Sequence, residues 1–343
     1  MGKVTCHTRR TVMFAVTGVA IMVLFMASLM LGPADIPASA VVRILSGDGS
    51  YNEGWRYIVA GYRLPQALTA MLCGGGLAVC GLMLQSILRN PLADPSLLGI
   101  SSGAGLGVAV VMLWHGGSLA LGSMVSTGII AVMTASFAGA MAVTCLMYVL
   151  STLIRSTASL LIAGVMVGYL SSSAIVLLNY FASSDGIRAY LLWGMGNFSG
   201  ISMDMMPYFA LPVIICLIAS ALLVKPLSLV VLGDAYASNL GVNTTLLRNS
   251  VLVVTGALAS IATSFCGPVS FIGLAVPHVA RIILKTDSFS LLLPSVFLAG
   301  SAIALLCNVV SVGHGGGEII PLNALTPIFG APVIMYILLK KRQ

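Results

Sequence analysis

The chain alternates between long apolar stretches and short polar breaks that contain Gly or Pro. A helix needs about 20 apolar residues to cross the hydrocarbon core of a bilayer. This pattern predicts an all-α polytopic membrane protein with about ten transmembrane helices, forming a single transmembrane domain over residues 1–343. The predicted spans are residues 11–31, 64–87, 96–114, 119–150, 158–181, 205–224, 250–267, 270–285, 291–312 and 323–339.

Three of these spans need comment. Residues 119–150 are too many for one straight crossing, so this helix should tilt, kink or extend beyond the bilayer. Residues 270–285 are too few and include Pro277 and His278, which favours a position buried among other helices. The first stretch, 11–31, exceeds the roughly 7–15 apolar residues of a signal peptide. We interpret it as a retained span and not as a leader cleaved near Ala40.

Composition agrees with a membrane protein. Charged residues make up 7% of the chain and hydrophobic residues 59%, whereas soluble domains carry about 25% charged residues. The 37 glycines fit helices that pack closely through small residues. The seven cysteines show no CxxC spacing, so they predict packing residues and neither a disulfide framework nor a metal site.

Basic residues orient the chain, because Lys and Arg gather in cytoplasmic loops. With the N-terminus inside, residues 88–95, 151–157, 225–249 and 286–290 are cytoplasmic, as are the tails 1–10 and 340–343. The basic residues then left outside are Arg43, Arg56, Arg63 and Arg188, out of 16 in total. This bias explains the net charge of +7 without a nucleic-acid partner. We therefore expect a lipid-embedded chain with both termini in the cytoplasm.

Two features that the sequence lacks indicate how transport by this protein would be energised. No Asp, Glu, Lys or Arg lies in the middle of a predicted span, although ion-coupled transporters usually keep an ionisable group there. No GxxxxGK[ST] sequence occurs, so the phosphate-binding loop of an ATPase is missing from this chain. The chain is therefore expected not to be an enzyme and to hold no cofactor, with ATP used by a partner subunit.

Two cytoplasmic segments carry distinctive motifs. The first, RNPLADP at residues 89–95, follows a Gly-rich span and precedes LLGISSGA; Ser96 is predicted to cap the next helix. By spacing alone, a rigid reverse turn explains it. The second, LGDAYASNLGVN at residues 232–243, predicts a short helix capped by Asp234 and stopped by Gly241, with another helix starting at Asn243 or Thr244. It suits a cytoplasmic partner, although a solvated loop is the simpler alternative.

Two further motifs lie nearer the C-terminus. GPVSFIGLAVPHVAR at residues 267–281 contains His278, which no second metal ligand accompanies, so we favour a structural role for it. The other begins at Glu318 and continues through Pro321, Thr326 and Gly330 into a Pro-interrupted last span.

Taken together, these four motifs resemble the FecCD family of permeases, which serve importers of iron-siderophores, haem and cobalamin. The similarity runs from Arg63 to Arg342 in the family's order. It implies the type II permease fold of ATP-binding-cassette (ABC) importers in a bacterial cytoplasmic membrane. It also implies three kinds of partner: a second permease, usually an identical copy; two ATPase subunits; and a periplasmic or lipoprotein substrate-binding protein.

The resemblance also assigns roles to residues. ATPase coupling falls to Gly233, Asp234, Ala237, Leu240 and Gly241, and a short outer helix to the stretch 187–200. The cytoplasmic gate is assigned to Asn90, Leu92, Ser156 and Thr157.

Departures from the family pattern affect the outer face. Gln66 stands where relatives carry a second Arg, which leaves Arg63, and Val312 or a neighbour replaces another Arg. Docking of the binding protein is therefore assigned to Arg63, Arg56 and Arg188. Residues 319–327 also depart from the usual sequence, so they receive no individual roles.

Two other classes of function stay open on the residues alone. A secondary transporter or channel would be driven by an ion gradient and be insensitive to ATP depletion. An intramembrane enzyme should show clustered polar catalytic groups, whereas this chain has only scattered Ser, Asn and His.

Overall fold

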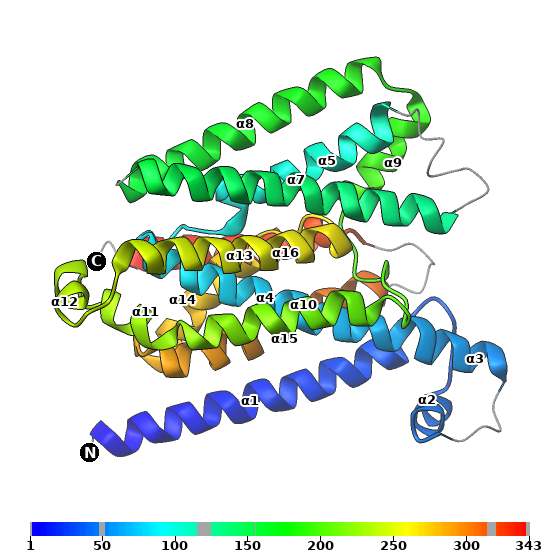
Figure 1. The fold of residues 1–343 in the computed structure, drawn as a ribbon. Coiled ribbons are helices and arrows are strands. Elements are labelled where there is room, and N and C mark those ends of the chain that lie inside the picture. The colour runs from blue at the N-terminus through cyan, green and yellow to red at the C-terminus, as the bar shows by residue number, and fades with distance from the viewer. Residues whose placement is uncertain (1, 48–51, 115–124, 155, 314–319, 341–343) are drawn as a thin grey trace.

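The computed structural model describes residues 2–47, 52–114, 125–154, 156–313 and 320–340, and these ranges form helices and no β-strand (Figure 1). The long helices are α1 (Gly2–Met30), α4 (Leu64–Ile87), α5 (Ile100–Trp114), α7 (Val125–Leu153), α8 (Thr157–Phe181), α10 (Met206–Leu222), α13 (Thr244–Cys266), α14 (Ile272–Leu284), α15 (Phe289–Val312) and α16 (Leu322–Lys340). The short ones are α2 (Ala38–Leu45), α3 (Glu53–Ile58), α9 (Ser184–Gly194), α11 (Val224–Val230) and α12 (Asp234–Asn239).

Each predicted span coincides with a long helix, apart from residues 119–124, which lie outside the described ranges. Among the described residues, six helices are long and apolar enough to cross a membrane. The pair α10 and α11, bent by 48°, supplies a seventh. Helices α5, α14 and α16 are apolar but shorter. The prediction for α14 is confirmed, because most of its residues, Pro277 included, are buried.

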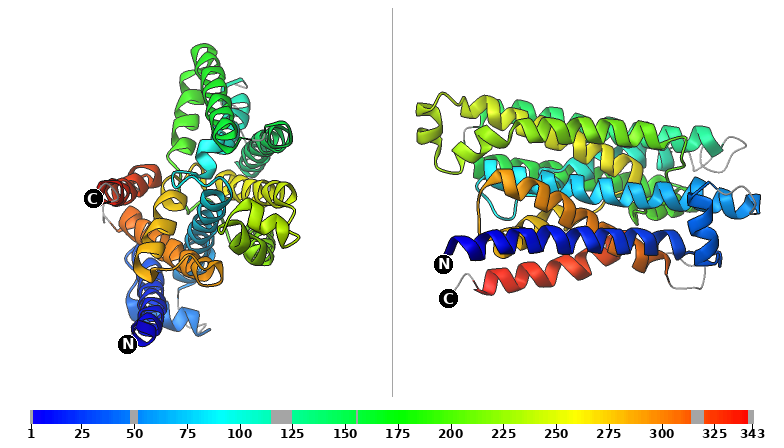
Figure 2. Two further views of the ribbon diagram at one scale, coloured as in Figure 1. Left: turned by 90° about the vertical axis from the view of Figure 1, so that its left-hand side faces the viewer. Right: turned by 90° about the horizontal axis from the view of Figure 1, so that it is seen from below.

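Helix α4 forms the centre of the bundle and packs against α10, α13, α14 and α15 (Figure 2). Glycines allow the closest of these contacts: a Cβ on Gly81 would lie 1.8 Å from the Gly273 carbonyl oxygen of α14. A Cβ on Gly74 would lie 2.5 Å from the Gly300 oxygen of α15. Backbones therefore approach more closely here than any side chain permits, as is common between membrane helices.

Buried polar groups attach the C-terminal end of α1 to the bundle. Asn308 of α15 donates to the Ser28 hydroxyl at 2.6 Å and accepts from the Gln66 amide at 2.9 Å. The buried Arg63 guanidinium donates to the carbonyl groups of Leu29 and Met30, and also to that of Ala34. Helix α1 therefore supplies Asn308 with one of its two partners and Arg63 with two of its three carbonyl groups.

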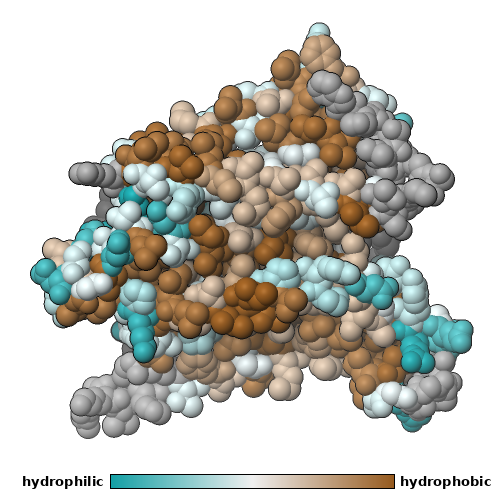
Figure 3. Space-filling view, viewed as in Figure 1, coloured by the Kyte–Doolittle hydropathy of each residue, from teal (hydrophilic) through white to brown (hydrophobic). Residues whose placement is uncertain are grey.

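The bundle has two distinct ends. Helix α1 begins and α16 finishes at the end that carries α12, whereas α2, α3 and α9 lie toward the opposite end (Figure 1). On the face shown in Figure 3, hydrophobic side chains cover the middle of the molecule, and strongly hydrophilic ones gather toward the two ends. This distribution matches a chain whose middle faces lipid and whose ends face water.

Candidate functional site

The turn between α4 and α5 brings several of the predicted site residues together. Helix α4 ends at Ile87, and Arg89 then adopts a left-handed conformation (φ 47°), which is unusual for a residue with a side chain. The Asn90 side chain accepts a hydrogen bond from the Leu92 amide at 2.9 Å. We call residues 89–92 the gate turn, after the gate role that the family resemblance predicts for Asn90 and Leu92.

Asp94, and not Ser96 as predicted, caps the single 3-10 turn at Pro95–Leu98. Its carboxylate accepts from the Ser96 amide at 3.1 Å and also from the Ser96 hydroxyl. Asp94 takes this place because its side chain lies one position before the turn, as a cap must. Burial raises the pKa of Asp94, and the two hydrogen bonds from Ser96 oppose that rise.

Helix α14 supports the gate turn from one side. The His278 ring lies with Nε2 2.7 Å from the Pro91 carbonyl oxygen, which agrees with the structural role predicted for this histidine. Arg281 donates to the Gln85 side chain at 2.9 Å and to the Ser86 hydroxyl at 3.2 Å, near the end of α4. The gate turn is therefore positioned by polar contacts that α14 makes to it and to the preceding residues.

The N-terminal part of α8 faces the gate turn from another side. Ser156 caps α8 by accepting from the Ser159 amide, and Thr157 is the first helical residue. A cavity of about 290 Å³ separates the two elements; it is lined by Asn90, Leu92, Leu97, Leu161, Ile162, Val165 and Met166. The structure thus brings Asn90 and Leu92 to this cavity, while Ser156 and Thr157 lie at the start of the helix that forms its other wall.

The segment assigned to coupling differs in detail from the prediction. Residues 225–249 are mostly helical: they include most of α11, all of α12 and the start of α13. Gly233 (φ 126°) and not Asp234 precedes the first turn of α12, because the chain turns there through a conformation that favours glycine. Gly241 is left-handed as predicted (φ 82°), and Asn243 caps α13 through the Leu246 amide.

Three large apolar side chains are exposed on α12 and immediately beside it. Leu232, Tyr236 and Leu240 follow one another at intervals of four residues, and each is more than half exposed. Ala237 is buried beneath them and fixes the short helix to the bundle. A row of exposed apolar side chains outside the lipid-facing middle is typical of a surface that a partner covers.

An ion pair connects α12 to the gate turn. Arg89 Nη2 lies 2.8 Å from the Asp234 carboxylate, and both side chains are about half exposed (51% and 57%). The sequence placed these residues in separate motifs, and no spacing pattern indicated that they meet.

The opposite end of the bundle holds the residues assigned to docking. Arg63 is only 4% exposed and its guanidinium is occupied by carbonyl groups of the α1 end, so a docking partner cannot reach it. Its position favours a structural role over the predicted docking role. Arg56 on α3 and Arg188 on α9 are exposed at this end and are accessible to a partner.

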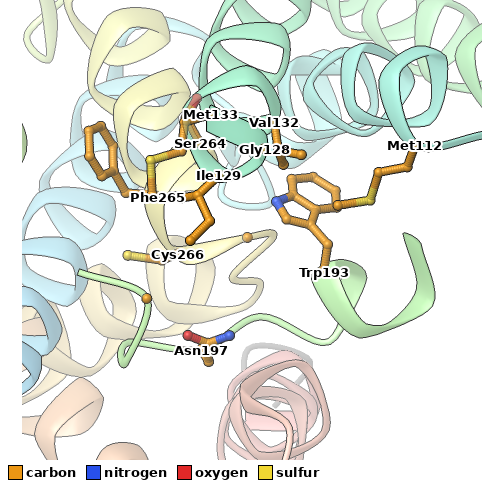
Figure 4. A pocket seen from close by; sticks show the side chains of 12 residues that line it. Met112, Gly128, Ile129, Val132, Met133, Trp193, Asn197, Ser264, Phe265 and Cys266 are labelled. Carbon is orange, nitrogen blue, oxygen red and sulfur yellow. The ribbon is translucent and has the colours of Figure 1, made fainter. Parts of the chain in front are cut away.

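A second cavity, of about 230 Å³, lies among α5, α7, α9 and α13 near the same end (Figure 4). Met112, Ile129 and Trp193 line it together with Phe265 and Cys266, so its walls are largely apolar. Sequence reasoning missed this cavity because its walls come from separate helices and share no motif.

Comparison with known proteins places this arrangement in a family. The profile of the FecCD transport family matches residues 20–340. The Vitamin B12 import system permease protein BtuC of Salmonella paratyphi A is 34% identical over 283 residues, which cover 82% of this chain and 83% of that protein. BtuC of Escherichia coli O9:H4 (strain HS) is 33% identical over the same length.

A solved structure shares the fold. It is described as an inward-facing conformation of a putative metal-chelate type ABC transporter, with a TM-score of 0.80 and 25% identity over 96% of this chain and 99% of that one. The helical bundle and these matches define a multi-pass membrane permease of the ABC importer class. The chain belongs to the FecCD transport family.

Proposed function

We propose that this chain forms the translocation pathway of an ATP-driven importer for a metal chelate, with cobalamin as the first cargo to test. Two copies of the chain would enclose the pathway, two ATPase subunits would bind the face that carries α12, and a substrate-binding protein would dock at the opposite face. The contact between α12 and the gate turn carries this proposal, because it joins a partner-facing helix to an element beside a cavity.

The proposed orientation follows from charge. Arg89 pairs with Asp234 of α12, while Lys225 lies in α11 and Arg248 near the start of α13, two helices that contact α12. These basic residues therefore lie at the end of the bundle that carries α12. Since basic residues favour the cytoplasmic side, this end would face the cytoplasm and the end with α3 and α9 would face outward. The ATPase subunits would then have access to α12, in a bacterial cytoplasmic membrane.

The class of cargo rests on relatives and on chemistry. The two related permeases belong to vitamin B12 import systems, and the related structure is of a putative metal-chelate type ABC transporter. The cavity beside the gate turn has largely apolar walls, with Asn90 as the polar residue among its lining. Such walls suit passage of a large solute without strong binding, so selectivity would reside mainly in the binding protein. Ferric siderophores and haem are the other members of this cargo class.

The test is uptake by the assembled transporter in proteoliposomes. The permease is reconstituted with its ATPase and substrate-binding partners, and the vesicle lumen, which corresponds to the cytoplasm, is loaded with ATP. We expect uptake of labelled cobalamin, ferric siderophore or haem that requires both ATP and the binding protein. Uptake driven by an ion gradient in the absence of ATP would instead establish the secondary transporter.

A further inference from the structure

The gate turn is bound to three different elements of the structure. The Asn90 amide donates to the Gln85 carbonyl group at the end of α4 (3.2 Å), and the Pro91 carbonyl group contacts His278 of α14. Arg89 pairs with Asp234 at the first turn of α12. The first two contacts lie within the membrane bundle, whereas the third reaches α12, where Leu232, Tyr236 and Leu240 are exposed on and beside the helix.

The backbone at Arg89 is held in an unfavourable conformation. A left-handed φ is unfavourable for a residue with a Cβ atom, whereas glycine adopts it freely. An arginine is found here instead of glycine, and its side chain makes the ion pair with α12. The side chain thus provides a contact that a glycine at this position could not make.

We infer that Arg89 is a positioning residue that transmits displacement of α12 to the gate turn through its ion pair with Asp234. This inference rests on the proposed function, because it needs an ATPase that moves α12. Asp234 is the first residue of α12, so any movement of that helix moves the carboxylate that Arg89 contacts. Arg89 in turn lies next to Asn90, which lines the cavity toward α8.

Because Arg89 and Asp234 are both about half exposed to solvent, the loss of their ion pair should have a modest effect on transport. Ion pairs in water contribute about 0.2–1 kcal/mol, which corresponds to a factor of roughly 1.4 to 5 in an equilibrium. A partner seated on α12 would exclude water from the pair, and attraction between charges increases when water is excluded. We therefore expect loss of the pair to reduce cargo moved per ATP hydrolysed by about two- to fivefold, with the assembly itself intact.

Arg89→Gly distinguishes the contribution of the side chain's ion pair from that of the backbone conformation. Glycine relieves the strain at this position, so the turn should keep its shape while the ion pair is lost. The expected result is ATP hydrolysis near the wild-type rate with two- to fivefold less uptake per ATP. Asp234→Arg should also lower uptake per ATP. Combining it with Arg89→Asp restores the pair with exchanged charges and should recover part of that loss relative to Asp234→Arg alone.

The matched control is Asp287→Asn, which removes an acid 3.9 Å from Arg281 at the same end of the molecule and without contact to the gate turn. It should leave the uptake per ATP unchanged. Equal uptake per ATP in the wild type and in Arg89→Gly would overturn the inference while leaving the proposed function intact. Failure of the wild type itself to show ATP-driven uptake would remove the proposed function, and the inference with it.

A second measurement reports on the gate turn directly. Spin labels at Leu92→Cys and Ile162→Cys, on the two walls of the cavity, follow the distance across it when nucleotide is added to the assembled transporter. We expect a nucleotide-dependent change of distance that Arg89→Gly diminishes. An undiminished change in that variant would contradict transmission through this ion pair.

Discussion

The contact between Gly81 and Gly273 leads to a sharp prediction about stability. An added Cβ on Gly81 would lie 1.8 Å from the Gly273 carbonyl oxygen, whereas real Cβ atoms almost never come within 3.0 Å of such a neighbour. Since the obstructing atom belongs to the backbone, no rotamer change relieves the clash. In Gly81→Ala, α4 and α14 would have to move apart by about 1.2 Å in an interior packed to crystal density.

We expect Gly81→Ala to be destabilised by about 1–3 kcal/mol, the usual cost of overpacking. Gly76→Ala on the same helix is the matched control, because its Cβ would meet Leu258 Cδ1 at an ordinary 3.4 Å. Both substitutions gain up to about 1 kcal/mol of helix propensity, so their difference isolates the contact between α4 and α14.

The assay is the fraction of protein that stays monodisperse in detergent after heating, measured by size-exclusion chromatography over a range of temperatures. Gly81→Ala should lose half of its monodisperse fraction several degrees below both the wild type and Gly76→Ala. If the two variants survive heating equally well, the close approach of α4 and α14 described above is incorrect.

Three further predictions concern buried polar groups. Arg63→Ala should destabilise the protein by about 1–3 kcal/mol in the same heating assay, because three carbonyl groups lose their donor. Arg56→Ala should instead lower only the affinity for the binding protein. If Arg63→Ala lowered that affinity and left stability unchanged, the predicted docking role of Arg63 would be correct. Gln66→Leu should cost about 1–3 kcal/mol by leaving Asn308 short of a partner, and unchanged stability would contradict that hydrogen bond. Burial raises the pKa of Asp94, so stability linked to its protonated form is present at acidic pH and is lost as pH rises through that pKa. Asp94→Asn keeps the capping oxygen and should therefore gain stability over wild type at neutral pH but not at acidic pH, as a pH series of heating curves would reveal.

Much of the fold could be predicted because a bilayer imposes strong local rules. Spans must be long and apolar, so hydropathy located each long helix. The observed α1 and α13 begin at Gly2 and Thr244, well before the predicted starts at residues 11 and 250, because a helix can continue beyond its apolar stretch. The start or end of a helix was predictable where a single residue determines it, as with Asn243 before α13 and Gly241 after α12. The short α11 and its 48° bend from α10 were not predicted, because an apolar stretch of this length carries no mark of where a helix changes direction.

The candidate site was predicted only in part. The gate and coupling segments were recognised from motifs, and the structure adds how they relate in space. The role of Arg63 could not be deduced from its position in a motif, since exposed and buried arginines look alike in a sequence. Its burial follows from the carbonyl groups at the end of α1, which lie about thirty residues earlier in the chain.

By itself, the sequence determined that this protein is a helical membrane permease of one family, because hydropathy and contiguous motifs are properties of neighbouring residues. The tertiary structure alone decided that Arg89 meets Asp234, that His278 meets Pro91, and that Gln66 joins α4 to Asn308. Each of these contacts joins residues far apart in the chain. Their geometry depends on the close packing of several helices at once, which no local pattern records.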